Sequence, residues 1–136
     1  MVVDTSALAA ILFNEPERAF FTDLILQMPG VATSTGVVLE TDVLLRRRFP
    51  GYEGKALDEL LVVLGIEVVP FDETQTALAR AALASYGQGR HPAALTFGDC
   101  LVMGLARQRA APLLFKGDGF ALTDIEPAWL PEDHPA

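Results

Sequence analysis

The segment Met1-Val2-Val3-Asp4-Thr5-Ser6 holds the first apolar run and the first acidic residue of the chain. Its three apolar residues predict a short buried strand from Met1 to Asp4, and residues 6–13 predict the helix that follows. Further strands are expected at residues 31–34, 66–69 and 112–115, with helical patterns between them. Strands that alternate with helices are typical of a parallel sheet covered on both faces, so the sequence predicts an α/β fold.

Five more helices are expected along the chain. Their patterns cover residues 16–28, 35–47, 55–64, 73–86 and 96–109. Asp72 and Gln75 fit an N-cap and its partner at the start of the fourth, and Thr96 with Asp99 fits a capping box at the start of the fifth. Acidic side chains at these helix starts therefore have a structural explanation beside any functional one.

The composition is that of an acidic globular domain. The chain has 136 residues, with 18 Asp or Glu against 10 Lys or Arg, and a formal net charge of −8. Hydrophobic residues make up 51%, which is enough for a core and excludes a disordered chain. We expect a single domain over residues 1–136, with the tail 127–136 at the periphery. The acidic balance argues against nucleic-acid binding by a broad basic surface.

Membrane, leader and disulfide features are not expected. The longest uncharged stretch, Leu24 to Leu39, is short and broken by Pro29 and Gly30, so it does not predict a membrane span. The N-terminus lacks the basic region of a secretory leader. The single cysteine, Cys100, excludes an intramolecular disulfide framework and a cysteine-rich zinc site. We therefore expect a cytoplasmic protein without a membrane partner.

Four carboxylates in apolar surroundings are candidates for a metal site: Asp4, Glu40, Asp99 and Asp118. Asp4 ends the first predicted strand and Asp118 follows the last, and the carboxyl ends of parallel strands meet at one edge of a sheet. Mg²⁺ and Mn²⁺ prefer such oxygen ligands. Two carboxylates ~5 Å apart repel by ~3 kcal/mol at an effective dielectric of about 20, so a converging group favours a bound cation.

Each of the four also has a structural interpretation. Asp4 fits an N-cap, and Glu40 fits a solvated helix residue. Asp99 fits the capping box, and Asp118 fits a turn between Gly117 and Gly119. It is their occurrence together, at places that a parallel sheet brings close, that favours a functional site.

The order of these motifs carries a family resemblance. They are Val3-Asp4-Thr5-Ser6-Ala7-Leu8, then Glu40, then Phe97-Gly98-Asp99-Cys100, then Leu113-Leu114-Phe115-Lys116-Gly117-Asp118-Gly119-Phe120. The set resembles a PIN domain, and more narrowly a VapC-type toxin, the ribonuclease of a type II toxin–antitoxin pair. Residues 67–72 and 86–93 are also similar to that subgroup, so the resemblance covers nearly the whole chain.

The resemblance implies a three-layer sandwich with a central parallel five-stranded sheet and an acidic magnesium site. Carried over by position, the site residues would be Asp4, Glu40, Asp99 and Asp118. Ser6 matches the family's small hydroxyl residue and would hold a metal-bound water or a carboxylate. Gly119 departs from the pattern because relatives often have a second Asp there. Asp124 is the remaining candidate for a fifth ligand.

The resemblance also implies the activity and the partners. The protein would be a Mg²⁺-dependent endoribonuclease, with Mn²⁺ as a substitute, that hydrolyses RNA phosphodiester bonds and inhibits translation and growth. A cognate VapB-type antitoxin would neutralise it, and the toxin would form a homodimer. The apolar stripes of helices 16–28 and 55–64 could serve these interfaces, although core burial explains them equally well.

RNA binding still needs positive charge, which is scarce in this chain. Arg46-Arg47-Arg48 is the only basic run, and it could contact RNA or simply end a helix as solvated cations. Lys116 could pair with a site carboxylate, contact phosphate, or be an ordinary surface lysine.

Two other functions fit parts of the same sequence. A phosphoacceptor receiver domain is also a small α/β fold with an acidic magnesium pocket and a lysine after its last strand. It would need Asp72 as the phosphoacceptor, which the helix cap explains more simply. A catalytically silent PIN-fold binding module would be separated from a nuclease by a ribonuclease assay with and without Mg²⁺.

Overall fold

Four short parallel strands form the centre of the fold in the computed structural model, which describes residues 1–131. The strands are β1 (Val2–Val3), β2 (Ala32–Ser34), β3 (Glu67–Val69) and β4 (Leu113–Leu114). Their order in the sheet is β3-β2-β1-β4, and every neighbouring pair is parallel. The predicted α/β architecture and all four predicted strand positions are confirmed.

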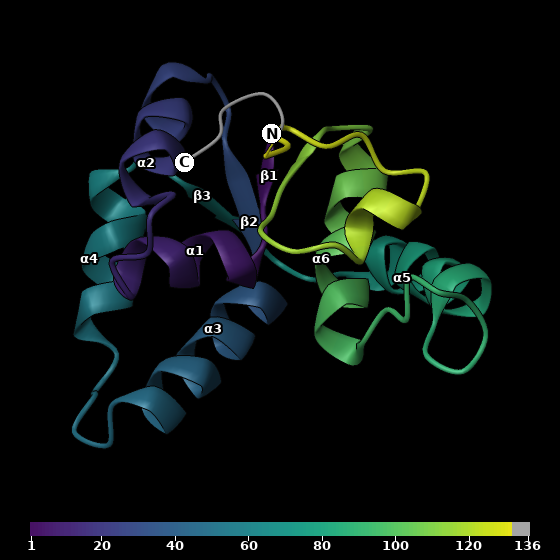
Figure 1. The fold of residues 1–136 in the computed structure, drawn as a ribbon, viewed down its shortest axis with the longest axis horizontal. Helices are drawn as coiled ribbons and strands as arrows, with labels where there is room; N and C mark the ends of the chain where they lie inside the picture. The colour runs from purple at the N-terminus through teal and green to yellow at the C-terminus, as the bar shows by residue number, and fades with distance from the viewer. Residues whose placement is uncertain (132–136) are drawn as a thin grey trace.

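Helices cover both faces of this sheet (Figure 1). They are α1 (Thr5–Leu12), α2 (Arg18–Gln27), α3 (Thr35–Arg48), α4 (Lys55–Val63), α5 (Glu73–Tyr86) and α6 (Phe97–Arg109). Helices α1, α2 and α4 lie on one side of the sheet, and α5 and α6 lie on the other. Helix α3 packs against both α1 and α6, so it joins the two outer layers below the carboxyl ends of the strands.

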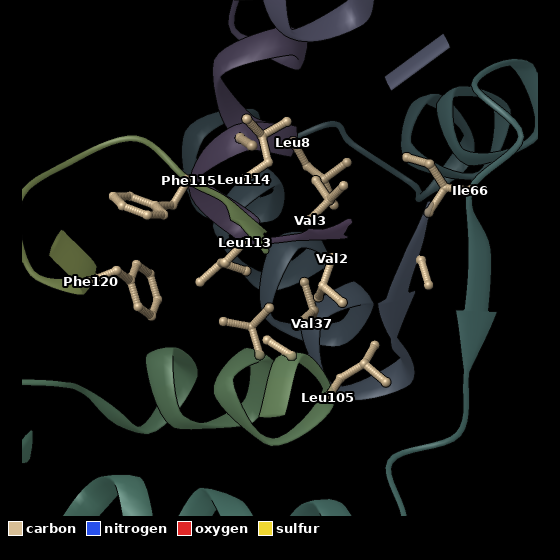
Figure 2. Close-up of a cluster of buried hydrophobic side chains, with 14 of the residues drawn as sticks. Val2, Val3, Leu8, Val37, Ile66, Leu105, Leu113, Leu114, Phe115 and Phe120 are labelled. Carbon is tan, nitrogen blue, oxygen red and sulfur yellow. The ribbon is translucent and has the colours of Figure 1, made fainter. Parts of the chain in front are cut away.

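Alternating side chains of the central strands fill the core on both sides of the sheet. Val2 pairs with Leu113 and Val3 pairs with Leu114, and all four are fully buried. Figure 2 shows Val2 and Leu113 pointing toward α6, while Val3 and Leu114 point toward α1, which carries Leu8. Because both faces of the sheet are covered by apolar side chains, β1 and β4 are unbroken hydrophobic runs in the sequence.

The fifth strand expected from the family resemblance is reduced to a single bridge. Pro127 lies beside Leu113 in parallel orientation, with one hydrogen bond from Leu113 N–H to Glu126 O (2.9 Å) and one from Ala128 N–H to Leu113 O (2.8 Å). β4 is only two residues long, which leaves little length for further pairing with this segment. The sheet of the described residues therefore has four strands, with residues 126–128 at the place of a fifth.

The tail is less peripheral than expected. Trp129 is only 7% exposed and packs edge-on against Phe21 of α2 at a centroid distance of 5.1 Å. Residues 128–130 of the tail thus contribute to the core or pack against it, whereas residues 132–136 lie outside the described residues.

Replacing Trp129 with Ala is expected to lower the free energy of unfolding by ~3 kcal/mol, because it removes a large buried aromatic side chain. Leu122→Ala, at a half-exposed position that follows β4, is the matched control and should change the free energy by less than ~1 kcal/mol. Urea unfolding followed by circular dichroism measures both variants. Tryptophan fluorescence cannot be used, because Trp129 is the only tryptophan. Equal midpoints for Trp129→Ala and the wild type would contradict this packing role.

Candidate active site

Asp4 stands where β1 ends and α1 begins, and its carboxylate is almost fully buried. It is the N-cap of α1, and its Oδ2 accepts hydrogen bonds from the Ser6 N–H (3.0 Å) and the Ser6 hydroxyl (2.6 Å). The residue is 4% exposed, and within residues 1–131 its Oδ1 has no hydrogen-bond partner. The N-cap interpretation is confirmed, but it accounts for only one of the two carboxylate oxygens.

Ser6 links this carboxylate to the segment that follows β4, the strand next to β1. Its hydroxyl donates to Asp4 and accepts a hydrogen bond of 2.9 Å from the backbone N–H of Lys116, which follows β4. The predicted hydroxyl at position 6 thus contacts a carboxylate, and it ties the ends of two neighbouring strands together.

Glu40 reaches the same place from helix α3. Its Oε1 accepts a 2.6 Å hydrogen bond from the hydroxyl of Thr5, the residue after Asp4. Its carboxylate also lies directly against Gly98 of α6, so closely that a Cβ at position 98 would overlap it. Glu40 is therefore a partly buried residue held between α1 and α6, and not the freely solvated helix residue of the alternative interpretation.

Asp99 lies in the first turn of α6, next to Gly98. The predicted capping box is present: Asp99 Oδ2 accepts from the Thr96 N–H (2.9 Å), and the Thr96 hydroxyl accepts from the Asp99 N–H (3.3 Å). The cap fixes the start of α6 at the edge of the sheet where Asp4 and Glu40 lie.

The three carboxylates influence one another electrostatically. Burial raises the pKa of Asp4 from an ordinary 3.8 to about 7; the hydrogen bonds from Ser6 lower it, and the charges of Asp99 and Glu40 raise it again. Burial also raises the pKa of Glu40, the Thr5 hydrogen bond lowers it, and the charge of Asp99 adds to the increase. Such raised values mark a place where negative charge is unfavourable without a cation.

The donor set fits a divalent cation that retains much of its hydration. Asp4 Oδ1 is a buried carboxylate oxygen without a hydrogen-bond partner in the described part of the chain, and carboxylate oxygen is the type of ligand that Mg²⁺ prefers. Among residues 1–131, no three Asp, Glu, His or Cys side chains are gathered closely enough to hold an ion on their own. One or two carboxylates with several waters are an ordinary Mg²⁺ environment, so Asp4 with Glu40 or Asp99 is sufficient.

The other predicted acidic residues are placed differently. Asp118 follows β4 as expected, but it is exposed, and no hydrogen bond or ion pair joins it to the other three in the described structure. Asp124 pairs with Arg107 (3.1 Å) near the C-terminal end of α6, whereas Asp99 lies at the N-terminal end. Asp124 as a fifth ligand was therefore wrong.

The side chain of Lys116 turns away from the acidic site. Its Nζ pairs with Glu15 (2.8 Å) and Glu17 (3.1 Å) in the connection between α1 and α2. The hydrogen bond to Glu15 is the main reason that its pKa is raised. Of the three predicted roles, pairing with a site carboxylate was wrong; only the backbone of Lys116 reaches the site, through Ser6.

The three consecutive arginines at the end of α3 have different surroundings. Arg46 pairs with Asp42 at 2.8 Å, and the guanidinium of Arg48 lies 5.0 Å from the ring centre of Phe13. Arg47 lines a groove between α3 and α6 that also contains Glu40 and the highly exposed Phe97. Within the basic run, Arg47 thus shares a groove with the candidate-site carboxylate of Glu40.

Comparison with known proteins identifies the family. A family model described as the PIN domain matches residues 1–126. The chain belongs to the PIN domain family. "Ribonuclease VapC" of Mycolicibacterium smegmatis is 42% identical over 92% of this chain and 97% of the relative, and "Ribonuclease VapC30" of Mycobacterium tuberculosis is 41% identical over 96% and 100%. At these identities this PIN domain belongs among the VapC ribonucleases.

Solved structures share the fold of this PIN domain. VapC20 of Mycobacterium tuberculosis, described as a Sarcin-Ricin loop cleaving toxin, matches with a TM-score of 0.65 at 23% identity, over 93% of this chain and 98% of that one. VapBC2 from Rickettsia felis, bound to a DNA fragment from their promoter, matches with a TM-score of 0.69 at 17% identity, over 93% and 95%. The receiver alternative is not supported, and Asp72 instead caps α5 by accepting from the Gln75 N–H (2.8 Å).

Two residues of the candidate site were missed from the sequence. Thr5 lies within the first motif but was given no role, and Gly98 counted only as part of the Asp99 motif. Position was the available signal, because each directly adjoins a predicted carboxylate. Their contacts with Glu40 depend on how α1, α3 and α6 meet, which no local pattern reveals.

In the metal-free PIN domain, stability is expected to fall as pH rises from about 4 to about 7. Over this range Asp4 loses its proton in the unfolded chain but keeps it in the folded protein, so each pH unit disfavours folding by up to ~1.4 kcal/mol. Asp4→Asn does not titrate. Its stability relative to the wild type should therefore rise by on the order of 3 kcal/mol between pH 4 and pH 8.

Urea unfolding at both pH values, with chelator present, measures this difference. Asp118→Asn at the exposed position is the matched control and should follow the wild type. If the free energies of unfolding of the wild type and of Asp4→Asn changed in parallel with pH, burial would not raise the pKa of Asp4 in solution.

Proposed function

We propose that this protein is a divalent-metal-dependent endoribonuclease that acts as the toxin of a VapBC-type toxin–antitoxin pair. The observation that carries the proposal is the buried carboxylate of Asp4, beside Glu40 and Asp99 in a VapC-family chain. One of its oxygens is bound by Ser6, and the other has no partner among the residues that the structure describes. The predicted translation and growth arrest follows from cleavage of cellular RNA.

The cation would be Mg²⁺, with Mn²⁺ as a substitute, held by Asp4 together with Asp99 or Glu40. When bound, it would polarise the scissile phosphate and lower the pKa of a water that attacks phosphorus. Ser6 holds the Asp4 carboxylate by donating two hydrogen bonds to its Oδ2, and among residues 1–131 Oδ1 has no partner and would be available to hold the ion.

Asp118 is the fourth proposed site residue. It lies in an exposed loop between Gly117 and Gly119, just past the strand that adjoins β1. A position on a loop suits a residue that completes the site once RNA is bound, and loss of its carboxylate is expected to matter less than loss of Asp4.

The proposed partners follow from the charge of the site. An acidic pocket attracts a basic side chain, so a VapB-type antitoxin could block it by presenting one. The solved FitAB structure, described as bound to the IR36 DNA fragment, has the same fold with a TM-score of 0.66 at 22% identity. A homodimer and a cytoplasmic location belong to the same proposal; none of the described helices is long and apolar enough to cross a bilayer.

Asp4→Asn and Asp99→Asn are each expected to reduce RNA cleavage at least ~100-fold, because each removes a negative ligand of the ion. The amide oxygen that Asp99→Asn introduces can still accept from Thr96, so the start of α6 should be retained. Cleavage of a labelled RNA in Mg²⁺, in EDTA, and in EDTA followed by excess Mn²⁺ measures the metal requirement. Growth arrest on expression should disappear with the same variants.

Asp42→Asn is the matched control. Asp42 lies two residues after Glu40 on α3 but pairs with Arg46, so cleavage should stay close to that of the wild type. Undiminished cleavage in EDTA would overturn the metal role. No cleavage of any RNA, together with no growth arrest, would favour the silent binding module.

Arg47→Ala is expected to raise the KM for RNA several-fold and to reduce the salt dependence of binding by about 0.7 in the log–log slope, as loss of one phosphate contact predicts. Arg48→Ala is the matched control, because its guanidinium packs on Phe13 instead of lining the groove beside Glu40. Equal effects of the two variants would argue against a specific RNA contact at position 47.

A further inference from the structure

The Glu40 carboxylate is held by groups that the proposed reaction does not use. Glu40 has a long, flexible side chain on helix α3, and without restraint this side chain would populate many rotamers in solvent. Instead its Oε1 accepts a short hydrogen bond from the Thr5 hydroxyl (2.6 Å). This contact joins two residues that are 35 positions apart in the chain and lie on different helices.

Thr5 is itself fixed by a second buried hydroxyl. Thr41 lies next to Glu40 on α3 and is fully buried, and its Oγ1 is 3.0 Å from the Thr5 Oγ1 and 2.8 Å from Val37 O. The Thr5 hydroxyl has one proton and three oxygens in reach: Glu40 Oε1 at 2.6 Å, Thr41 Oγ1 at 3.0 Å and Val37 O at 3.4 Å. The shortest contact, to the charged carboxylate, directs that proton to Glu40.

Gly98 has no side chain, and the Glu40 carboxylate occupies the space that a side chain there would need. A Cβ at position 98 would overlap the Glu40 carboxylate, so any other residue would displace Glu40 or move α6. Asp99 follows immediately, and its capping box fixes the same turn. The hydroxyl on one side and the bare backbone on the other together define a single position for Glu40.

We infer that Thr5 is a positioning residue that holds the Glu40 carboxylate ready for the cation. Thr41 contacts the Thr5 hydroxyl, and Gly98 contacts the carboxylate from the other side. The inference rests on the proposed function, because it concerns the same acidic site. A methyl group in place of the hydroxyl would leave the packing volume of Thr5 nearly unchanged while removing the only hydrogen bond to the Glu40 carboxylate in the described structure.

Two kinds of measurement test this inference on the full chain. The first is Mn²⁺ binding by isothermal titration calorimetry. Thr5→Val is expected to weaken it about tenfold, in line with loss of a hydrogen bond to a charged group, and Thr5→Ser, which keeps the hydroxyl, should bind within about twofold of the wild type. The second is the crystal structure of each metal-free variant, in which Thr5→Val should release Glu40 from Gly98 and Thr5→Ser should not.

Thr33→Val is the matched control for loss of a buried threonine hydroxyl. Thr33 is fully buried on β2 and donates to Val3 O (2.8 Å), so its replacement costs stability without touching Glu40. Mn²⁺ affinity should be unchanged. Gly98→Ala, which keeps Thr5 intact, should displace the same carboxylate from the other side.

A double-mutant cycle separates positioning from a general structural effect. In a Glu40→Ala background, Thr5→Val should have no further effect on Mn²⁺ affinity. A tenfold loss in that background, or an unchanged Thr5→Val affinity with Glu40 still against Gly98, would overturn the inference. If the wild type binds no Mn²⁺, the proposed function fails, and the metal-free structures alone decide whether Thr5 positions Glu40.

Discussion

Burial of the Asp4 carboxylate is the constraint on which the rest of the site depends. A carboxylate that is 4% exposed is unfavourable as an anion, which is why burial raises the pKa of Asp4 to about 7. The two hydrogen bonds from Ser6 offset only part of this effect, and the charges of Glu40 and Asp99 add to it. A protein selected only for stability would place a neutral N-cap such as Ser or Asn here, so the charge points to use of the site.

The parallel sheet explains how distant segments reach this carboxylate. β1, β2 and β4 run in the same direction, so the segments that leave their carboxyl ends emerge at one edge. β1 leads into Asp4, β2 leads directly into α3 with Glu40, and β4 leads into Lys116, whose N–H reaches Ser6. Helix α6 enters the same edge from the opposite layer and brings Asp99. Each contribution comes from the first residues after a strand or from a helix that crosses this edge.

The sequence predicted those features that local chemistry determines. Strand positions, the capping box of Thr96 with Asp99 and the cap at Asp72 depend on a few neighbouring residues, and all were confirmed. The missed features depend on tertiary contacts. Whether Lys116 faces the site or Glu15, and whether Trp129 leaves the surface to pack on Phe21, is decided by segments more than 90 residues away. The fifth strand is an intermediate case, because the sequence shows Pro127 but does not show that it pairs with Leu113 at a single position.

The distribution of positive charge bears on how this acidic protein would hold RNA. Within residues 1–131, five of its ten Lys and Arg residues form ion pairs with carboxylates: Arg46, Lys55, Arg107, Arg109 and Lys116. Their charge is largely neutralised locally, and the net charge of −8 repels a phosphate backbone. In the proposed site, affinity for the scissile phosphate would come mainly from the cation and from a few groups beside it, such as Arg47. A substrate held this way would be recognised close to the cut, because little binding energy would be available from contacts farther along the strand.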